Sequence, residues 1–159
     1  MLRKSLFVLS FLQLVLAVPV KSQVIDTSGM LFRIAGEGPA VVERVPMMRS
    51  CMVHSTLMWQ EGSYTVGAIG RHAFYCNYQL RVVSIPSSVV EIYSEAFYQC
   101  SSLRHIYVEG AVPPVCDEKS FMGVDRRKCV LHVPYGSLQA YKRSAGWGEF
   151  KKIRERKKR

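Results

Sequence analysis

Beyond its first 22 residues, this 159-residue sequence has no apolar run long enough to cross a membrane, and it lacks the short motifs of common catalytic sites. There is no G-x-G-x-x-G, no G-x-x-x-x-G-K-[ST] and no G-x-S-x-G. The glycines of GEGPA at 36–40 precede no helical pattern, so they predict a turn and not a phosphate loop. No C-x-x-C or tight His/Cys cluster occurs. We therefore predict no enzyme, no metal site and no cofactor.

The N-terminus has the composition of an export signal. Two basic residues precede the apolar run SLFVLSFLQLVLAV, which is shorter than a membrane-spanning helix. Val20 and Ser22 occupy the small-residue positions before a cleavage site, and Ala17 offers a second one. The alternative is a buried apolar helix. We expect residues 1–22 to be a signal peptide, which would place the mature chain in the periplasm, at the cell surface or in the medium.

Positive charge is concentrated at the C-terminus. The formal net charge is +10, yet residues 23–150 carry 12 basic and 11 acidic side chains. The last nine residues, KKIRERKKR, hold seven basic side chains and one glutamate. Such a block is either a solvated, disordered end or an arm that binds anionic polymers by charge. The candidate polyanion-binding residues are Lys151, Lys152, Arg154, Arg156, Lys157, Lys158 and Arg159.

The five cysteines are an odd number, so export would leave at least one without a disulfide partner. Cys76 and Cys100 lie in similar phrases, and we expect both to be small buried hydrophobic residues. Cys116 and Cys129 flank a later loop. They either form a disulfide or remain apart, with Cys129 in the core.

A repeat of 23 residues runs through the middle of the chain. AIGRHAFYCNYQLRVVSIPSSVV at 68–90 aligns with EIYSEAFYQCSSLRHIYVEGAVP at 91–113, pairing Phe74 with Phe97. A weaker third copy follows, in which Phe121 lies 24 residues after Phe97. One such unit cannot bury its own apolar face, whereas stacked units can. We expect short strands to pair into a parallel sheet and the three phenylalanines to stack on the opposite wall.

Alternation along each strand sorts its side chains into inward and outward sets. The spacing L-x-x-L-x-L at Leu80–Ile85 and Leu103–Val108 directs the apolar residues inward. The outward set is either a contact patch for a partner or a solvated strand face, and self-association through exposed ends is a further option. The candidate binding face comprises Val82, Ser84, His105, Tyr107, Val130 and His132.

These residues carry a family resemblance. IGRHAFYCNYQLRVVSIPSSV resembles the repeat of the BspA-like leucine-rich repeats of bacterial surface proteins, and FMGVDRRKCVLHVPYGSLQAYKRSAGWGEFKKI is similar to the usual ending of that family. The resemblance covers about residues 24–153. The chain departs from the pattern in its short array, in His54 where proline is usual, and in its basic tail. The resemblance implies a leucine-rich-repeat solenoid and a binding module, acting in adhesion or protein interaction at the bacterial envelope or outside it.

The expected organisation combines these segments. Residues 23–66 form an N-terminal cap and a degenerate first unit, with a hairpin turning at 27–29. The leucine-rich repeats occupy 67–133, a helical cap occupies 134–153, and a basic tail occupies 154–159. The expected partner is a protein or glycan, and no nucleic acid is expected. The first alternative is a stable scaffold whose basic tail docks to anionic envelope polymers, and the second is an uncharacterised hydrolase.

Overall fold

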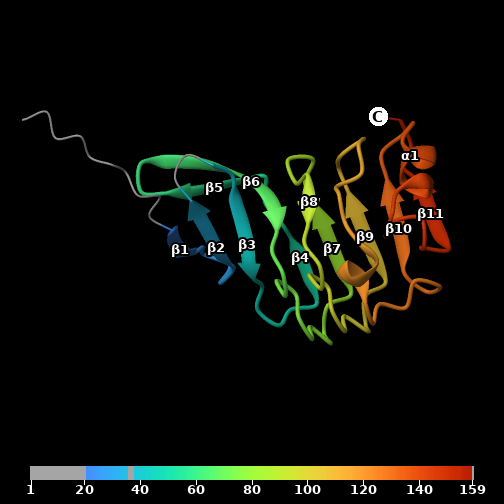
Figure 1. The fold of residues 1–159 in the computed structure, drawn as a ribbon, viewed down its shortest axis with the longest axis horizontal. Coiled ribbons are helices and arrows are strands. Elements are labelled where there is room, and N and C mark those ends of the chain that lie inside the picture. The colour runs from blue at the N-terminus through green and yellow to red at the C-terminus, as the bar shows by residue number, and fades with distance from the viewer. Residues whose placement is uncertain (1–20, 36–37, 159) are drawn as a thin grey trace, which may run out of the picture.

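The computed structural model describes residues 21–35 and 38–158. Strands dominate the described chain, and the helical elements are short (Figure 1). The strands are β1 (Lys21–Ile25), β2 (Leu31–Ala35), β3 (Ala40–Arg44), β4 (Ser50–Met52), β5 (Thr56–Trp59), β6 (Gly62–Ile69), β7 (Val82–Ile85), β8 (Glu91–Ile92), β9 (His105–Val108), β10 (Val130–Val133) and β11 (Lys152–Glu155). The helical elements are η1 (Glu118–Phe121), a 3₁₀ turn, and α1 (Leu138–Arg143). Neither is long and apolar enough to span a membrane.

The expected parallel sheet forms one wall of the molecule. Its strand order is β11-β10-β9-β7-β4, and every neighbouring pair is parallel. Val83 of β7 lies beside Ile106 of β9, which lies beside Leu131 of β10. Each strand is thus the same part of a successive coil, and the strands follow one another along the long axis (Figure 1). This is the stacking that the 23-residue period predicts.

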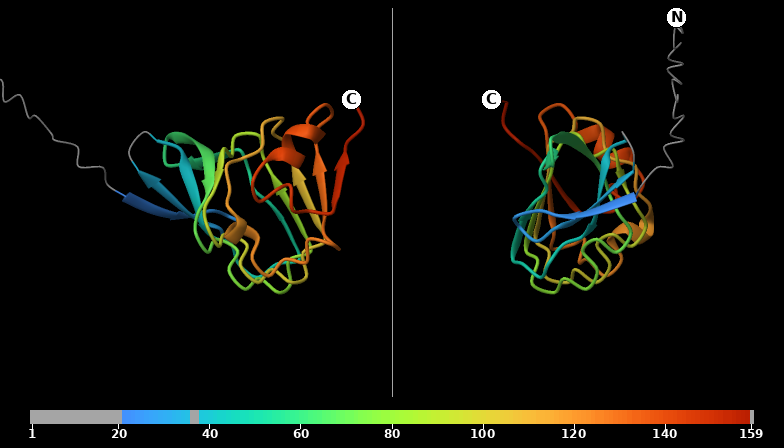
Figure 2. Two further views of the ribbon diagram at one scale, coloured as in Figure 1. Left: turned by 45° about the vertical axis from the view of Figure 1, so that its right-hand side comes forward. Right: turned by 90° about the vertical axis from the view of Figure 1, so that its left-hand side faces the viewer.

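A second, shorter ladder runs along another wall of the coils. β3, β6 and β8 pair in parallel, and Glu91 forms a further bridge to Val115. Seen along the long axis, the coils superpose around a common interior (Figure 2). Because both walls direct apolar side chains inward, one continuous core fills that interior.

The core contains the phenylalanine stack that the repeat predicts. The Phe74 and Phe97 rings lie 4.5 Å apart, and the Phe97 and Phe121 rings lie 5.2 Å apart, each pair within 14° of parallel. All three side chains are buried. Offset aromatic stacking adds to the free energy of burying apolar area, so this column ties three coils together.

The turns between the two walls repeat one backbone conformation. His72 and Glu95, 23 residues apart, both have positive φ. Positive φ recurs at Cys76, Gln99 and Gly123, which are equivalent positions of three coils. A non-glycine residue rarely adopts this conformation, so its recurrence shows that the stacked turns impose it.

In the first repeat, the buried position of the turn lies one residue after the cysteine. Cys76 is partly exposed, and Asn77 is the buried equivalent of Cys100. Asn77 Nδ2 donates a hydrogen bond to Pro46 O, and Cys100 Sγ donates one to Phe74 O. A strict 23-residue alignment pairs Asn77 with Cys100 and corrects the expectation that both cysteines are buried.

A hairpin closes the N-terminal end. β1 and β2 pair antiparallel, and Asp26 Oδ1 accepts hydrogen bonds from the backbone N–H groups of Ser28 and Met30. The carboxylate therefore holds the predicted turn. Residues 1–20 of the predicted signal peptide lie outside the described residues, and β1 begins at Lys21. Cleavage after Ala17 would retain the whole of β1, whereas cleavage after Ser22 would shorten it.

The C-terminal end is covered by α1 and the turns that follow it. Tyr141, Trp147 and Phe150 are buried, and Trp147 and Phe150 lie against Phe121. The polar tips are satisfied, since Tyr141 Oη donates to Gly110 O and Trp147 Nε1 donates to Pro114 O. These side chains cover the last layer of the core.

Residues 152–156 of the basic C-terminus are packed on the last coil, in contrast to the solvated end that was one of the two expected forms. Residues 152–155 form β11, which pairs with β10 and extends the parallel sheet. Arg156 then donates hydrogen bonds to both carboxylate oxygens of Glu109 and to Val108 O. The last coil therefore continues beyond residue 153, where the cap had been expected to end.

Candidate binding face

One side of the parallel sheet faces solvent, and we call it the outer sheet face. It consists of two rows of side chains that cross all five strands. The first row follows the register Ser50, Val82, His105, Val130 and Lys152, and the second follows Met52, Ser84, Tyr107, His132 and Arg154.

The structure brings three of the predicted residues together at the centre of this face. His105 Nδ1 lies 3.1 Å from His132 Nε2, so one of the two imidazoles donates a hydrogen bond to the other. The Tyr107 ring stacks on the His132 ring, with centroids 4.3 Å apart and planes 8° from parallel. Because the rings face each other along the sheet, their polar edges are the parts left to meet a partner.

The pKa of His132 is lowered from its usual value. Partial burial between neighbouring strands is the main cause, and unfavourable electrostatic interactions with His105, Arg154 and Arg156 add to it. At neutral pH the imidazole of His132 is therefore uncharged and able to accept a hydrogen bond. An anionic partner would offset the nearby positive charge and favour its protonation.

The other predicted residues share the face but differ in exposure. Val82 and Ser84 are partly exposed beside His105 and Tyr107. Val130 stands in the first row by register, yet its side chain is only 8% exposed. It therefore supports the rows more than it contributes to their accessible surface.

The basic residues of the C-terminus join this same face. Lys152 pairs with Val130 and Arg154 pairs with His132, so β11 adds two cationic side chains to the ends of the two rows. Lys151, Lys157 and Lys158 are exposed on either side of the strand, whereas Arg159 lies outside the described residues. The candidate face and the candidate polyanion tail, separate in the sequence interpretation, are one surface in the structure.

Three arginines that the sequence analysis did not single out lie along the edge where these strands begin. Arg49 O accepts a hydrogen bond from Arg81 N, and Arg81 O accepts one from Arg104 N, so the three follow one another coil by coil. The phrase Leu-Arg occurs at 80–81 and again at 103–104, at the period of the repeat. This recurrence was the signal that could have identified two of them.

The cysteines offer no second site. All five are free thiols, which corrects the suggested disulfide between Cys116 and Cys129. Cys129 is fully buried in the core, whereas Cys116 Sγ donates to Ala145 O in the C-terminal cap. Burial raises the pKa of both thiols to about 12, which disfavours the reactive thiolate.

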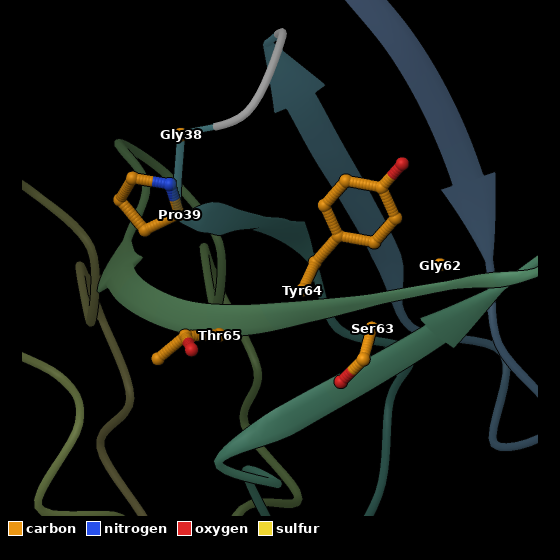
Figure 3. Close-up of a pocket in the computed structure, with 6 residues that line it drawn as sticks. All are labelled: Gly38, Pro39, Gly62, Ser63, Tyr64 and Thr65. Carbon is orange, nitrogen blue, oxygen red and sulfur yellow. The ribbon is translucent and has the colours of Figure 1, made fainter.

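A hollow beside β6 is lined by glycine, proline and hydroxyl-bearing residues. A recess of about 470 Å³ lies against β6, next to Gly38 and Pro39 (Figure 3). Its polar side chains are Ser63, Tyr64 and Thr65. Across 21–35 and 38–158, no group of three His, Cys, Asp or Glu residues could hold a metal ion.

The stacked coils, the parallel sheet and the L-x-x-L-x-L spacing define a leucine-rich-repeat solenoid. Residues 54–125 match the family described as BspA type leucine rich repeat region, six copies. The repeat segment of this chain is therefore a BspA-type leucine-rich repeat region. A comparison with curated proteins found no match.

Two solved structures share the fold. A leucine-rich cell surface protein of Faecalibacterium prausnitzii is 21% identical, with a TM-score of 0.51 over 84% of this chain. A leucine-rich repeat protein of Bacteroides capillosus is 17% identical, with a TM-score of 0.56 over 86% of this chain and 100% of its own. The present chain spans 32% of the Faecalibacterium protein.

Proposed function

We propose that this chain is an exported binding module, which attaches through its outer sheet face to a protein or glycan at the bacterial envelope or outside it. The observation that carries the proposal is the contact of His105, Tyr107 and His132 at the centre of that face. The sheet holds these side chains in a fixed arrangement before a partner binds. Little conformational entropy of the side chains is therefore lost on binding. The family match and the cell-surface description of the Faecalibacterium protein support export and partner binding.

The alternative function is a scaffold whose basic tail docks separately to anionic polymers. Strand β11 bears on this alternative, because it contains part of that tail. Lys152 and Arg154 pair with β10, so these two basic residues lie beside the aromatic cluster. Removing residues 154–159 would also break the strand and the Arg156–Glu109 contact. Side-chain substitutions are therefore a cleaner test than truncation.

The test compares the full chain with the double variant His105→Ala/Tyr107→Ala on a panel of host matrix proteins, glycans and envelope polymers. The control is Tyr75→Ala/Tyr98→Ala, which removes an exposed aromatic stack from the turns and leaves the sheet face intact. We expect the first variant to lose affinity for the partner by tenfold or more, while the control keeps it. Equal affinity of all three proteins for every panel member would contradict the proposal.

A further inference from the structure

We propose that the partner of the outer sheet face is a sulfated polysaccharide, bound as an extended chain that crosses the strands. This inference rests on the proposed function and names the chemistry of the partner for the same surface. It follows from the charge of the face, from the spacing of its cations and from the orientation of its aromatic rings.

The positive charge of the outer sheet face comes from three places: the border where its strands begin, the border where they end, and the terminal strand β11. Arg49, Arg81 and Arg104 line the border where the strands begin, and Lys152 and Arg154 lie on β11. None of these five side chains forms an ion pair with a carboxylate of the described residues. Arg104 Nη1 donates hydrogen bonds to Ser101 O and Leu103 O, so only the other nitrogens of its guanidinium are left for an anion. Guanidinium groups suit the oxygens of sulfate and carboxylate groups.

Two carboxylates, Glu109 and Glu155, lie near the other border, and Glu155 Oε1 accepts hydrogen bonds from the backbone N–H groups of Gly136 and Leu138. Glu109 follows β9, and both of its oxygens accept hydrogen bonds from Arg156. Its negative charge is thus balanced within the protein, and it does not oppose an approaching anion. Lys157 and Lys158 lie beyond Arg156, next to a recess of about 250 Å³ that Tyr135 also lines. The strand ends therefore extend the positive potential of the face.

The cations are spaced as a line. Neighbouring parallel strands lie about 4.8 Å apart, so the arginines of successive coils form a row with roughly this step. Five strands span about 19 Å across the sheet. A row of this kind fits repeated anionic groups along an extended polymer better than a single small anion. Because the row of cations is long, several weak contacts to one polymer chain form together, and this raises the affinity for that polymer.

The aromatic rings favour a glycan over single-stranded nucleic acid. Sequence-tolerant binding of nucleic acids uses open ring faces on which bases stack. Here one face of Tyr107 and one face of His132 cover each other at 4.3 Å, and the other faces lie toward Ser84 and Arg154 of the same row. His105 contacts the edge of His132. What remains is a set of hydroxyl and imidazole edges, which are hydrogen-bonding partners for sugar hydroxyls and sulfate oxygens.

The experiment measures binding of the full chain to a sulfated heparin octasaccharide by titration calorimetry at low and high salt. The comparison ligands are the same octasaccharide without its sulfates, a single-stranded DNA and a polyglutamate peptide of matched charge. We expect the sulfated octasaccharide to bind most tightly, with an affinity that falls steeply as salt is added. Two double variants, Arg81→Ala/Arg104→Ala and Lys152→Ala/Arg154→Ala, should each weaken binding by about tenfold.

The control is Lys119→Ala/Lys142→Ala, which removes the same charge from η1 and α1 and should leave the affinity unchanged. Tighter binding of the DNA or the polyglutamate, or equal losses in the control and the two test variants, would overturn the inference. An uncharged partner that depends on His105 and Tyr107 but not on the arginines would overturn it as well, while leaving the proposed function standing. If no panel member depends on the face, both fail together.

Discussion

The two sides of the parallel sheet differ in how much their residues vary from one coil to the next. On the inner side the residues of successive coils are interchangeable in chemistry: Val83, Ile106 and Leu131 lie side by side and are fully buried. On the outer side the equivalent row changes from Ser84 through Tyr107 to His132. Stacking fixes the inner residues, because a gap in one layer also exposes its neighbours. The outer residues are free of that requirement, so they can differ from coil to coil without opening the core.

The largest expected effect comes from opening the inner side. Phe97→Ala would remove the middle ring of the phenylalanine stack and leave a cavity between Phe74 and Phe121. We expect the free energy of unfolding to fall by about 3–5 kcal/mol in urea denaturation. Tyr98→Ala, next in sequence and stacked on Tyr75 at the surface, should cost about 1 kcal/mol or less. Similar losses in both variants would mean that the stack is not a special feature of the core.

Thiol chemistry should separate buried from accessible positions of the same turn. Cys100 is fully buried, and burial raises its pKa to about 12, whereas Cys76 is partly exposed. Alkylation of the folded chain at pH 8 should label Cys76 at least about 100-fold faster than Cys100. Mass spectrometry of digested samples gives both rates, and labelling in denaturant supplies the control. Rapid labelling of Cys100 in the folded chain would contradict its burial in the core.

A smaller loss of stability is expected when the contact between Arg156 and Glu109 in the last coil is removed. Arg156→Ala removes the two hydrogen bonds to Glu109 and the one to Val108 O, at a site that is partly exposed. We expect a loss of about 1 kcal/mol in the free energy of unfolding, with faster amide exchange in β11 than in β9. Lys158→Ala is the matched control and should change neither quantity. Unchanged exchange in β11 in the Arg156 variant would show that backbone pairing alone holds the strand.

The smallest expected effect is the pH dependence of stability due to His132. Its folded pKa lies below the value of about 6.5 in the unfolded chain, so the unfolded state binds the proton more readily. The corresponding stability is complete above pH 6.5 and is lost as the pH falls through the folded pKa. Between pH 7.5 and 5, wild type should lose more stability than His132→Gln, by roughly 1 kcal/mol or less. An equal or smaller loss in wild type would contradict the lowered pKa.

Much of this architecture could be predicted from the sequence, because it depends on local periodicity. The spacing of Phe74, Phe97 and Phe121 predicted the stack, and alternation around Val83 and Ile106 predicted the inner and outer rows. The family resemblance added the solenoid. In each case the signal is the same residue type at a repeated distance, which requires no knowledge of contacts between distant segments.

The last strand could not be predicted in that way. In β11 only Ile153 packs against the core, and charged residues surround it, so the segment has the composition of a solvated end. It becomes a strand because β10 offers an unpaired edge and because Arg156 meets Glu109, 47 residues earlier. The basic residues of β11 join the outer sheet face only through this pairing. Because the pairing cannot be seen in the sequence, the sequence interpretation treated tail and face as two separate sites.

The most direct test of the central claim maps where a ligand contacts the folded chain. Backbone amide shifts of the isotopically labelled chain would be followed by nuclear magnetic resonance during titration with the sulfated heparin octasaccharide. The account predicts that the largest changes fall on β7, β9, β10 and β11, around His105, Tyr107 and His132. Changes confined to the turns around Tyr75 and Tyr98, or the absence of any change at saturating octasaccharide, would contradict it.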